Sequence, residues 1–158
     1  MKKFKLIAGP CAIEDRDTAF VIANEVKRIC NKYNIEYIFK GSYEKANRSK
    51  LDSFTGIDKH AALKILKEVS DQLGVDNITD VHESYEPAEI SEFVSHLQIP
   101  AFLCRQTKLL LAAGESGCTI NIKKGQFLSP EAMKFAIEKV QSTGNNKVWV
   151  CERGTISG

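Results

Sequence analysis

The chain has 158 residues, 43% of them hydrophobic and 27% charged, which is the composition of a globular domain with an apolar core. Its net charge of +2 is too small to suggest nucleic acid or an anionic membrane as the partner, so any anion site must be local. The five cysteines contain no Cys-x-x-Cys pair, which argues against a zinc ribbon or a disulfide framework and favours a reducing, cytoplasmic setting.

The first half of the sequence predicts two strand–helix pairs. Apolar residues spaced by three and four predict amphipathic helices over residues 16–33 and from Gly56 to Leu73, with Gly74 placed to end the second. A short apolar strand is predicted before each helix. These strands are Leu6–Ala8, closed by Gly9 and Pro10, and Tyr37–Phe39, which leads into a basic loop at Lys40.

The second half continues the alternation. Its predicted strands are Asn77–His82, Leu97–Ile99, Thr119–Lys123 and Lys147–Cys151. The helices predicted between them are one capped by Ser84 with Ile90, Phe93 and Val94 inside, one capped by Thr107 and ending at Gly114, and one beginning at Ser129 and Pro130. This order predicts right-handed crossovers and a parallel sheet, as in a doubly wound sheet or a (β/α)8 barrel. Gly-x-Gly-x-x-Gly and Walker sequences are absent.

Polar residues at the carboxyl ends of the predicted strands favour the barrel. They are Cys11, Lys40, Asp80 with His82, Gln98, Lys123 and Arg153. Successive strands that direct polar groups to one end are how a barrel builds its active site. The loop Lys40–Ser49 adds further cations, and lysine and arginine suit phosphate or carboxylate groups. The sequence therefore predicts a convergent site for an anionic small molecule.

Six collinear motifs resemble one family over nearly the whole chain. They are Leu6–Cys11, Lys45–Ser49, Thr79–Glu83, Gln98–Thr107, Asn121–Phe127 and Glu152–Gly154. They resemble the phosphoenolpyruvate-dependent sugar-acid synthases, which include 3-deoxy-D-manno-octulosonate 8-phosphate (KDO8P) synthase and 3-deoxy-D-arabino-heptulosonate 7-phosphate (DAHP) synthase. The Lys-Ala-Asn-Arg-Ser sequence at residues 45–49 is similar to the KDO8P branch, because the DAHP branch has Lys-Pro-Arg-Thr there.

The resemblance implies a single TIM-barrel domain over residues 1–158, present as about six of its eight βα units. A complete (β/α)8 barrel takes about 250 residues. The chain is therefore expected to be truncated at its carboxyl end and inactive on its own, because six strands cannot close an eight-stranded barrel.

The resemblance also implies the chemistry. Members of the KDO8P branch condense phosphoenolpyruvate with arabinose 5-phosphate and release phosphate, a transferase step in lipopolysaccharide biosynthesis, usually as tetramers. By resemblance, phosphoenolpyruvate contacts Lys40, Lys45, Arg105, Lys123 and Arg153; the sugar phosphate contacts Asn47, Arg48 and Ser49; Ser42 and Gln98 bind substrate; and Asp80, His82 and Lys45 are catalytic.

Cys11 resembles a ligand of the metal-dependent class of this family. A thiolate suits Fe²⁺, Zn²⁺ or Mn²⁺ bound together with imidazole and carboxylates, and the other ligands are expected to be missing from this chain. The residue itself also allows a buried, inert thiol. The remaining cysteines, His60 and His96 are expected to be core or surface residues.

Two other functions stay open. Departures from the family pattern at Gly41, Leu51, Asp52, Thr55 and Lys108 leave room for a DAHP synthase-like enzyme that uses erythrose 4-phosphate. A non-catalytic remnant that keeps an anion pocket is the second alternative. The expected setting is cytoplasmic, because no stretch approaches the roughly 20 apolar residues of a membrane span and the run Leu6–Ala8 is too short for a signal peptide.

Overall fold

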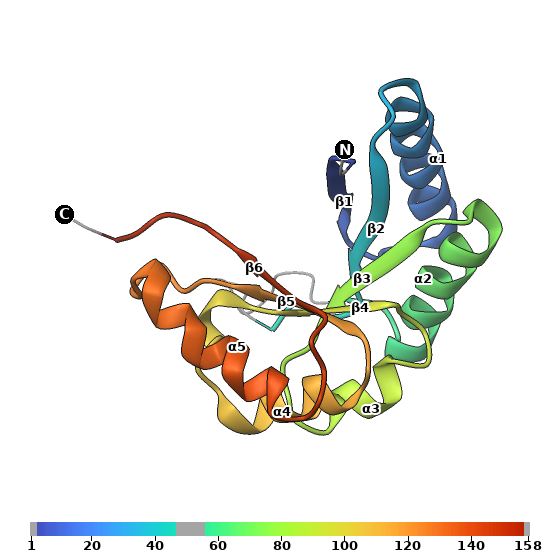
Figure 1. The fold of residues 1–158 in the computed structure, drawn as a ribbon. Helices are drawn as coiled ribbons and strands as arrows, with labels where there is room; N and C mark the ends of the chain where they lie inside the picture. Colours follow the sequence, from blue (N-terminus) through green and yellow to red (C-terminus); the bar gives the residue numbers. More distant parts are fainter. Residues whose placement is uncertain (1–2, 47–55, 157–158) are drawn as a thin grey trace. The chain divides into compact units, whose positions relative to one another are not determined.

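Strands and helices alternate along the chain in the computed structural model, which describes residues 3–46 and 56–156 (Figure 1). The first compact unit, residues 1–79, contains β1 (Lys5–Ala12), α1 (Arg16–Lys32), β2 (Glu36–Ser42), α2 (Lys59–Leu73) and all but the last residue of β3 (Asp76–Asp80). The second unit, residues 80–158, contains α3 (Glu86–Ile90), β4 (His96–Ile99), the 3-10 turn η1 (Ala101–Leu103), α4 (Thr107–Glu115), β5 (Thr119–Lys123), the 3-10 turn η2 (Pro130–Ala132), α5 (Met133–Gln141) and β6 (Val148–Cys151).

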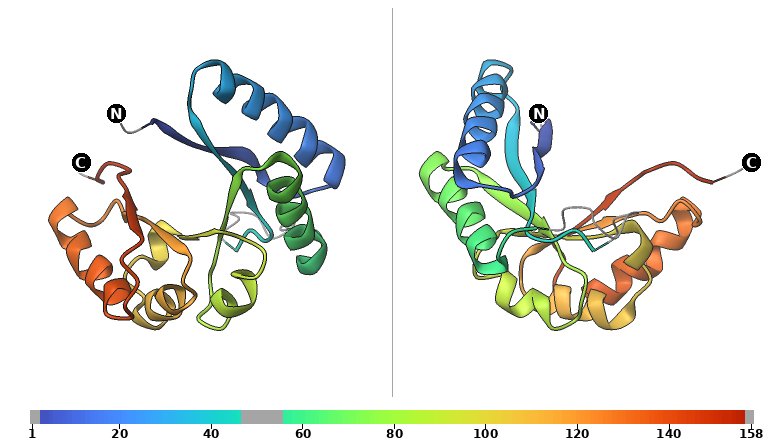
Figure 2. Two further views of the ribbon diagram at one scale, coloured as in Figure 1. Left: turned by 45° about the vertical axis from the view of Figure 1, so that its right-hand side comes forward. Right: turned by 180° about the vertical axis from the view of Figure 1, so that it is seen from behind.

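In the first unit, β2 pairs in parallel with β1 on one side and with β3 on the other. Helices α1 and α2 lie along one face of these strands (Figure 2). Phe39 of β2 and Leu63 and Leu66 of α2 are fully buried, so apolar residues of the central strand and of the helix form the core between them. Ile38, on the opposite face of β2, is fully buried as well.

Side chains at their ends stabilise both helices of the first unit. The Asp15 carboxylate accepts a hydrogen bond from the Thr18 N–H at the start of α1 (2.7 Å), and this bond lowers the pKa of Asp15. Asp58 accepts from the Ala61 N–H in the same way at the start of α2 (2.9 Å). Gly74 ends α2 in the left-handed conformation at φ 59°, as the sequence predicts.

In the second unit, β5 pairs in parallel with β4 on one side and with β6 on the other. Helices α4 and α5 pack against each other, and α5 contacts β6. Ser129 begins the η2–α5 segment as predicted, because its Oγ accepts from the Ala132 N–H. The buried Asn145 side chain donates to the carbonyl oxygens of Gly114 (3.1 Å) and Cys118 (2.8 Å), which ties the end of α4 to the start of β6.

Strands β1 and β2 extend well past their predicted carboxyl ends. Strand β1 continues through Gly9 and Pro10 to Ala12, and β2 continues to Ser42, so the predictions that Cys11 and Lys40 follow their strands are wrong. The physical reason is a bulge, since the β1–β2 register shifts between Ala8 and Cys11. A bulge lets a strand continue through glycine and proline residues that would otherwise end it.

Three predicted helix ends are also wrong. Neither Ser84 nor Thr107 caps a helix with its side chain: α3 starts at Glu86, and Thr107 is the first residue of α4. Gly114 lies inside α4 rather than after it. A Cβ atom at Gly114 would lie 2.5 Å from the Thr143 Oγ1, so this glycine serves close packing of α4 on the segment after α5.

The alternation, with parallel pairing of consecutive strands inside each unit, is that of part of a (β/α)8 barrel and confirms the predicted fold class. The single domain over residues 1–158 stays a prediction. Over residues 3–46 and 56–156, no helix combines the length and apolar character that crossing a membrane requires.

The bulge generates a test at Gly9. A Cβ atom there would lie 1.8 Å from the carbonyl oxygen of Lys40, so Gly9→Ala must separate β1 from β2 and is expected to lower the free energy of unfolding by about 3 kcal/mol. Urea unfolding measures the loss, and amide hydrogen exchange over residues 8–13 is expected to accelerate.

Gly74→Ala is the matched control. A Cβ atom at Gly74 would meet nothing within 4 Å, so this change carries only the cost of a left-handed alanine, about 1 kcal/mol. It is expected to leave exchange over residues 8–13 unchanged. Equal exchange in the Gly9 variant and in the unaltered protein would contradict the close approach of the two strands.

Candidate functional site

The bulge in β1 gives Cys11 an unusual backbone conformation. Cys11 has φ 71° in the left-handed region, is exposed, and pairs with Gly41 of β2. A non-glycine residue held there costs on the order of 1–3 kcal/mol, and such strain is concentrated at functional sites. The close contact of Gly9 with the Lys40 backbone holds this conformation in place.

Lys40, Ser42 and Lys45 gather at the end of β2. Gly41 faces α2, because a Cβ atom there would lie 3.3 Å from the Leu66 Cδ2, and its neighbours Lys40 and Ser42 therefore face away from the helices. The Lys45 Nζ donates a hydrogen bond to the Ser42 Oγ (2.9 Å). The helix-free side of the first unit thus carries two lysines and a hydroxyl group.

A ladder of three buried polar side chains crosses the strands of the second unit. The Gln98 Nε2 donates to the Asp80 Oδ1, and the Asn121 Nδ2 donates to the Gln98 Oε1 (3.1 Å). Their exposed fractions are 8% for Asp80, 2% for Gln98 and 5% for Asn121, so each depends on protein partners. Because both ends of the Gln98 amide are engaged, the orientation of the Asp80 carboxylate is restricted.

Three cations of the second unit end or follow its strands. Lys123 is two residues after Asn121 on β5 and therefore shares the face of the ladder. It pairs with Cys151 of β6, two residues before the exposed Arg153. Arg105 follows η1 and is exposed. The second unit therefore has Lys123 and Arg153 at the carboxyl ends of neighbouring strands, on the sheet that carries the buried amide–carboxylate ladder.

His82 lies in the turn after β3, which Glu86 orders. The buried Glu86 carboxylate accepts the backbone N–H groups of His82 (2.7 Å) and Glu83 (2.9 Å). This bond network fixes the backbone of His82 close to the end of the strand that carries Asp80. The half-buried His82 ring is thus held on an ordered turn.

The structure brings some predicted site residues together and leaves others untested. Lys45 joins Ser42, and Asp80 joins Gln98. Asn47, Arg48 and Ser49 lie outside the described residues, as do Leu51, Asp52 and Thr55. The roles assigned to all these residues stay predictions. Asn121 is a site residue that was not predicted, although its spacing of two from Lys123 on an alternating strand is the signal that places it on the same face.

The described residues do not form a metal site by themselves. Over residues 3–46 and 56–156, no group of three or more histidine, cysteine, aspartate and glutamate side chains is placed to hold a metal ion. Cys11 offers one thiolate, and specific transition-metal sites need three or four ligands. We therefore assign no step to a metal.

The other cysteines and histidines fit core or surface roles, as predicted. Cys30 and Cys118 are buried, and burial raises the pKa of both thiols, which makes them poor nucleophiles. Cys104 is fully buried and Cys151 is half-buried. His60 is exposed, whereas the buried His96 ring lies 4.9 Å from the Trp149 ring.

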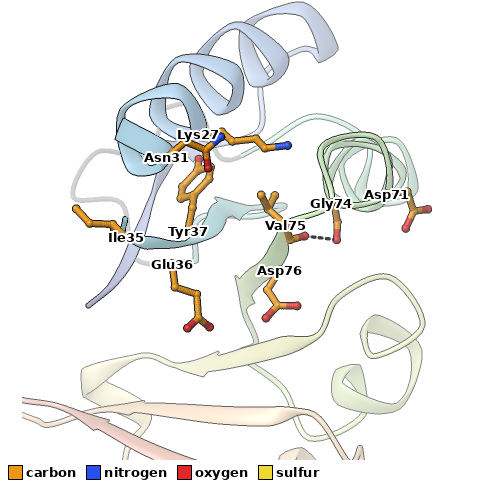
Figure 3. Close-up of a pocket in the computed structure, with 10 residues that line it drawn as sticks. Lys27, Asn31, Ile35, Glu36, Tyr37, Asp71, Gly74, Val75 and Asp76 are labelled. Atoms are coloured by element: carbon orange, nitrogen blue, oxygen red, sulfur yellow. Dashed lines mark hydrogen bonds between the residues drawn. The ribbon is translucent and has the colours of Figure 1, made fainter. Parts of the chain in front are cut away.

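A hollow of about 550 Å³ in the first unit lies at the opposite end of the strands (Figure 3). Its lining includes Lys27 from α1 and the acidic residues Glu36 and Asp76 at the amino-terminal ends of β2 and β3. The Lys27 Nζ donates to the Leu73 carbonyl, and Glu36 pairs with Lys5. None of the predicted site residues that the structure describes lines this hollow, and in barrels this end contributes stability.

Known proteins match the chain over nearly its whole length. The sequence profile described as the DAHP synthetase I family matches residues 2–158. The chain is 47% identical to a 2-dehydro-3-deoxyphosphooctonate aldolase of Cyanothece sp. over 98% of this chain and 57% of that protein. It is 46% identical to a protein of the same name from Fusobacterium nucleatum, over 99% of this chain and 56% of that protein. It is also 46% identical to one from Campylobacter jejuni, over 100% of this chain and 62% of that protein. The chain thus spans less than two thirds of the length of these curated relatives.

The ladder generates a test at Gln98. Gln98→Leu keeps the size of the side chain but removes both hydrogen bonds, so the buried Asp80 and Asn121 lose a partner. The free energy of unfolding is expected to fall by about 1–3 kcal/mol in urea titrations.

The matched control is Gln141→Leu, the same change at an exposed position of α5. It is expected to shift the free energy of unfolding by no more than about 0.5 kcal/mol. Equal effects of the two substitutions would show that the ladder adds nothing to the stability of the second unit.

Proposed function

This chain belongs to the DAHP synthetase I family, and from that premise we propose that it serves the condensation of phosphoenolpyruvate with arabinose 5-phosphate. The products are 3-deoxy-D-manno-octulosonate 8-phosphate and phosphate. The name of its relatives, 2-dehydro-3-deoxyphosphooctonate aldolase, supports an eight-carbon sugar acid. The observation that carries the proposal is the strand-end set of cations beside the Asp80–Gln98–Asn121 ladder.

The substrates explain the need for several cations. Phosphoenolpyruvate carries a phosphate and a carboxylate, and arabinose 5-phosphate adds a second phosphate. Fixed positive groups offset the repulsion between these anions, and they are most effective where water is excluded. We assign phosphoenolpyruvate to Lys40, Lys45, Arg105, Lys123 and Arg153, and the sugar phosphate to Asn47, Arg48 and Ser49.

Asp80 suits the reacting centre. In the proposed reaction the enol carbon of phosphoenolpyruvate attacks the aldehyde, and a carbon–carbon bond forms while positive charge develops at the neighbouring carbon, where water adds. A carboxylate close to that carbon stabilises the charge. The amide of Gln98 donates to Asp80 and so holds the carboxylate in one orientation. We propose His82 and Lys45 as the groups that move protons.

Three wider features of the protein are proposed with this function. A divalent metal is proposed with Cys11 as one donor, and its further ligands are proposed to be missing from this chain. A homo-oligomer in the cytoplasm is proposed from the family resemblance. The buried thiols of Cys30, Cys104 and Cys118 are in keeping with a reducing setting.

Phosphate release tests the proposal. The 158-residue chain is expected to release no phosphate from phosphoenolpyruvate and arabinose 5-phosphate, whereas a chain that also carries the remaining strands of its relatives is expected to turn over. Erythrose 4-phosphate in place of arabinose 5-phosphate tests the DAHP-type alternative. If the longer chain binds phosphoenolpyruvate but releases no phosphate with either sugar, the protein is a non-catalytic remnant. Rapid release by the short chain would contradict the need for the remaining strands.

Two substitutions separate the two substrate sites. Lys123→Ala is expected to weaken the binding of phosphoenolpyruvate more than that of the sugar phosphate, and Arg48→Ala is expected to do the reverse. The loss in binding free energy is expected to be about 1.5–3 kcal/mol for the affected ligand. Titration of each ligand against each variant of the longer chain measures this. Equal losses for both ligands in either variant would refute the assignment.

A further inference from the structure

Lys124, the neighbour of Lys123, is a fully buried lysine. Its exposed fraction is 0%, which is rare for a lysine and requires partners for its charge. The Lys124 Nζ donates to the carbonyl oxygens of Gly125 (3.2 Å), Leu128 (3.0 Å) and Gly154 (2.7 Å). Because an ammonium group has three donors, these carbonyls use its full capacity.

The partners of Lys124 come from two segments. Gly125 and Leu128 belong to the turn after β5, whereas Gly154 follows β6. The Glu152 Oε1 lies 3.3 Å from the Lys124 Nζ and adds an opposite charge from the second segment. Lys124 and Glu152, with these carbonyl groups, are called the β5–β6 clamp below.

Backbone bonds strengthen the β5–β6 clamp. The Lys124 N–H donates to the Cys151 carbonyl (2.9 Å), and the Ile156 N–H donates to the Gln126 carbonyl (2.9 Å). The Glu152 Oε1 also accepts the N–H groups of Arg153 (2.8 Å) and Gly154 (2.7 Å). The backbone of Arg153 is therefore held between two anchored neighbours.

Glu152 is suited to stay ionised in the clamp. Burial by itself raises the pKa of Glu152. The N–H groups of Arg153 and Gly154 and the Lys124 ammonium together lower this pKa by more, so it lies below its usual range. Since a lowered pKa means that the ionised form is favoured in the folded protein, the contribution of Glu152 is present at neutral pH and is lost as pH falls through the lowered value.

We propose that Lys124 is a positioning residue that holds the two anion-binding cations, Lys123 and Arg153, in place without touching the anion. Lys123 precedes it directly, and Arg153 lies between the clamp residues Glu152 and Gly154. This inference rests on the proposed function for the identity of the anion, phosphoenolpyruvate. Two cations that would repel each other are held in advance, so less ordering is needed when the ligand binds.

Lys124→Met tests the inference, because methionine is unbranched and of similar length but cannot donate. Amide hydrogen exchange over residues 152–156 is expected to accelerate by at least about tenfold, because a charge-assisted hydrogen bond is lost. Exchange in β5 is expected to stay unchanged. The dissociation constant of phosphoenolpyruvate is expected to rise by at least about tenfold for the same reason.

Lys147→Met is the matched control. Lys147 is exposed, directly precedes β6, and also donates to a backbone carbonyl, that of Gly117. This variant is expected to leave exchange over residues 152–156 and the affinity for phosphoenolpyruvate unchanged. Glu152→Gln is a second clamp variant for the case that Lys124→Met does not fold, and it is expected to accelerate exchange over residues 152–156.

The outcomes separate this inference from the proposed function. Unchanged exchange over residues 152–156 in the clamp variants would overturn the clamp and leave Lys124 as a core residue only. Faster exchange with an unchanged dissociation constant would overturn its role in anion binding. If the unaltered protein binds no phosphoenolpyruvate, the proposed function fails, and the exchange result still decides whether the clamp exists.

Discussion

The alternation of side chains along parallel strands is the constraint on which the site depends. One face of each strand must be apolar to pack against the helices, which leaves the other face for polar groups. In β2 this division is visible at neighbouring residues, where Gly41 packs against α2 and Lys40 and Ser42 face away from it. In the second unit the same division places Gln98 and Asn121 on one face, where they satisfy each other.

Buried polar groups are costly unless they find hydrogen-bond partners, and the second unit provides such partners in two places. In the ladder, the Gln98 amide bonds to both the Asp80 carboxylate and the Asn121 amide. The β5–β6 clamp satisfies the ammonium group of Lys124 with carbonyl groups of two segments. In both places the pairing rigidifies the backbone beside groups that we propose to contact substrate.

Local patterns predicted much of the fold. The bounds of β5 follow from the alternation of apolar and polar residues. The end of α2 follows from Gly74, a glycine placed directly after a helical pattern of apolar residues. The extension of β1 and β2 could not be predicted, because a glycine followed by a proline, as at Gly9 and Pro10, usually ends a strand. Here the pairing of β1 with β2 creates a bulge that lets the strand continue. The register between β1 and β2 depends on residues far apart in the chain, so it cannot be predicted from a local sequence pattern.

The candidate site was partly predictable for the same reason. Lys123 and Gln98 stand out because polar residues at strand ends are visible in the sequence. Alternation places Asn121 on the face of Lys123, but its hydrogen bond to Gln98 depends on the register between β4 and β5. Lys124 is adjacent to Lys123 and identical in type, and its burial depends on segments about thirty residues apart in the chain, as its bond to Gly154 shows.

Calorimetric titration of this chain with phosphoenolpyruvate, and with pyruvate at the same ionic strength, tests the central claim most directly. The two ligands share the carboxylate and differ by the phosphate, which the strand-end cations are proposed to bind. We expect one molecule of phosphoenolpyruvate to bind per chain, at least about tenfold more tightly than pyruvate, since the phosphate adds charge-assisted hydrogen bonds. Equal affinity for the two ligands, or no binding of either, would contradict the account.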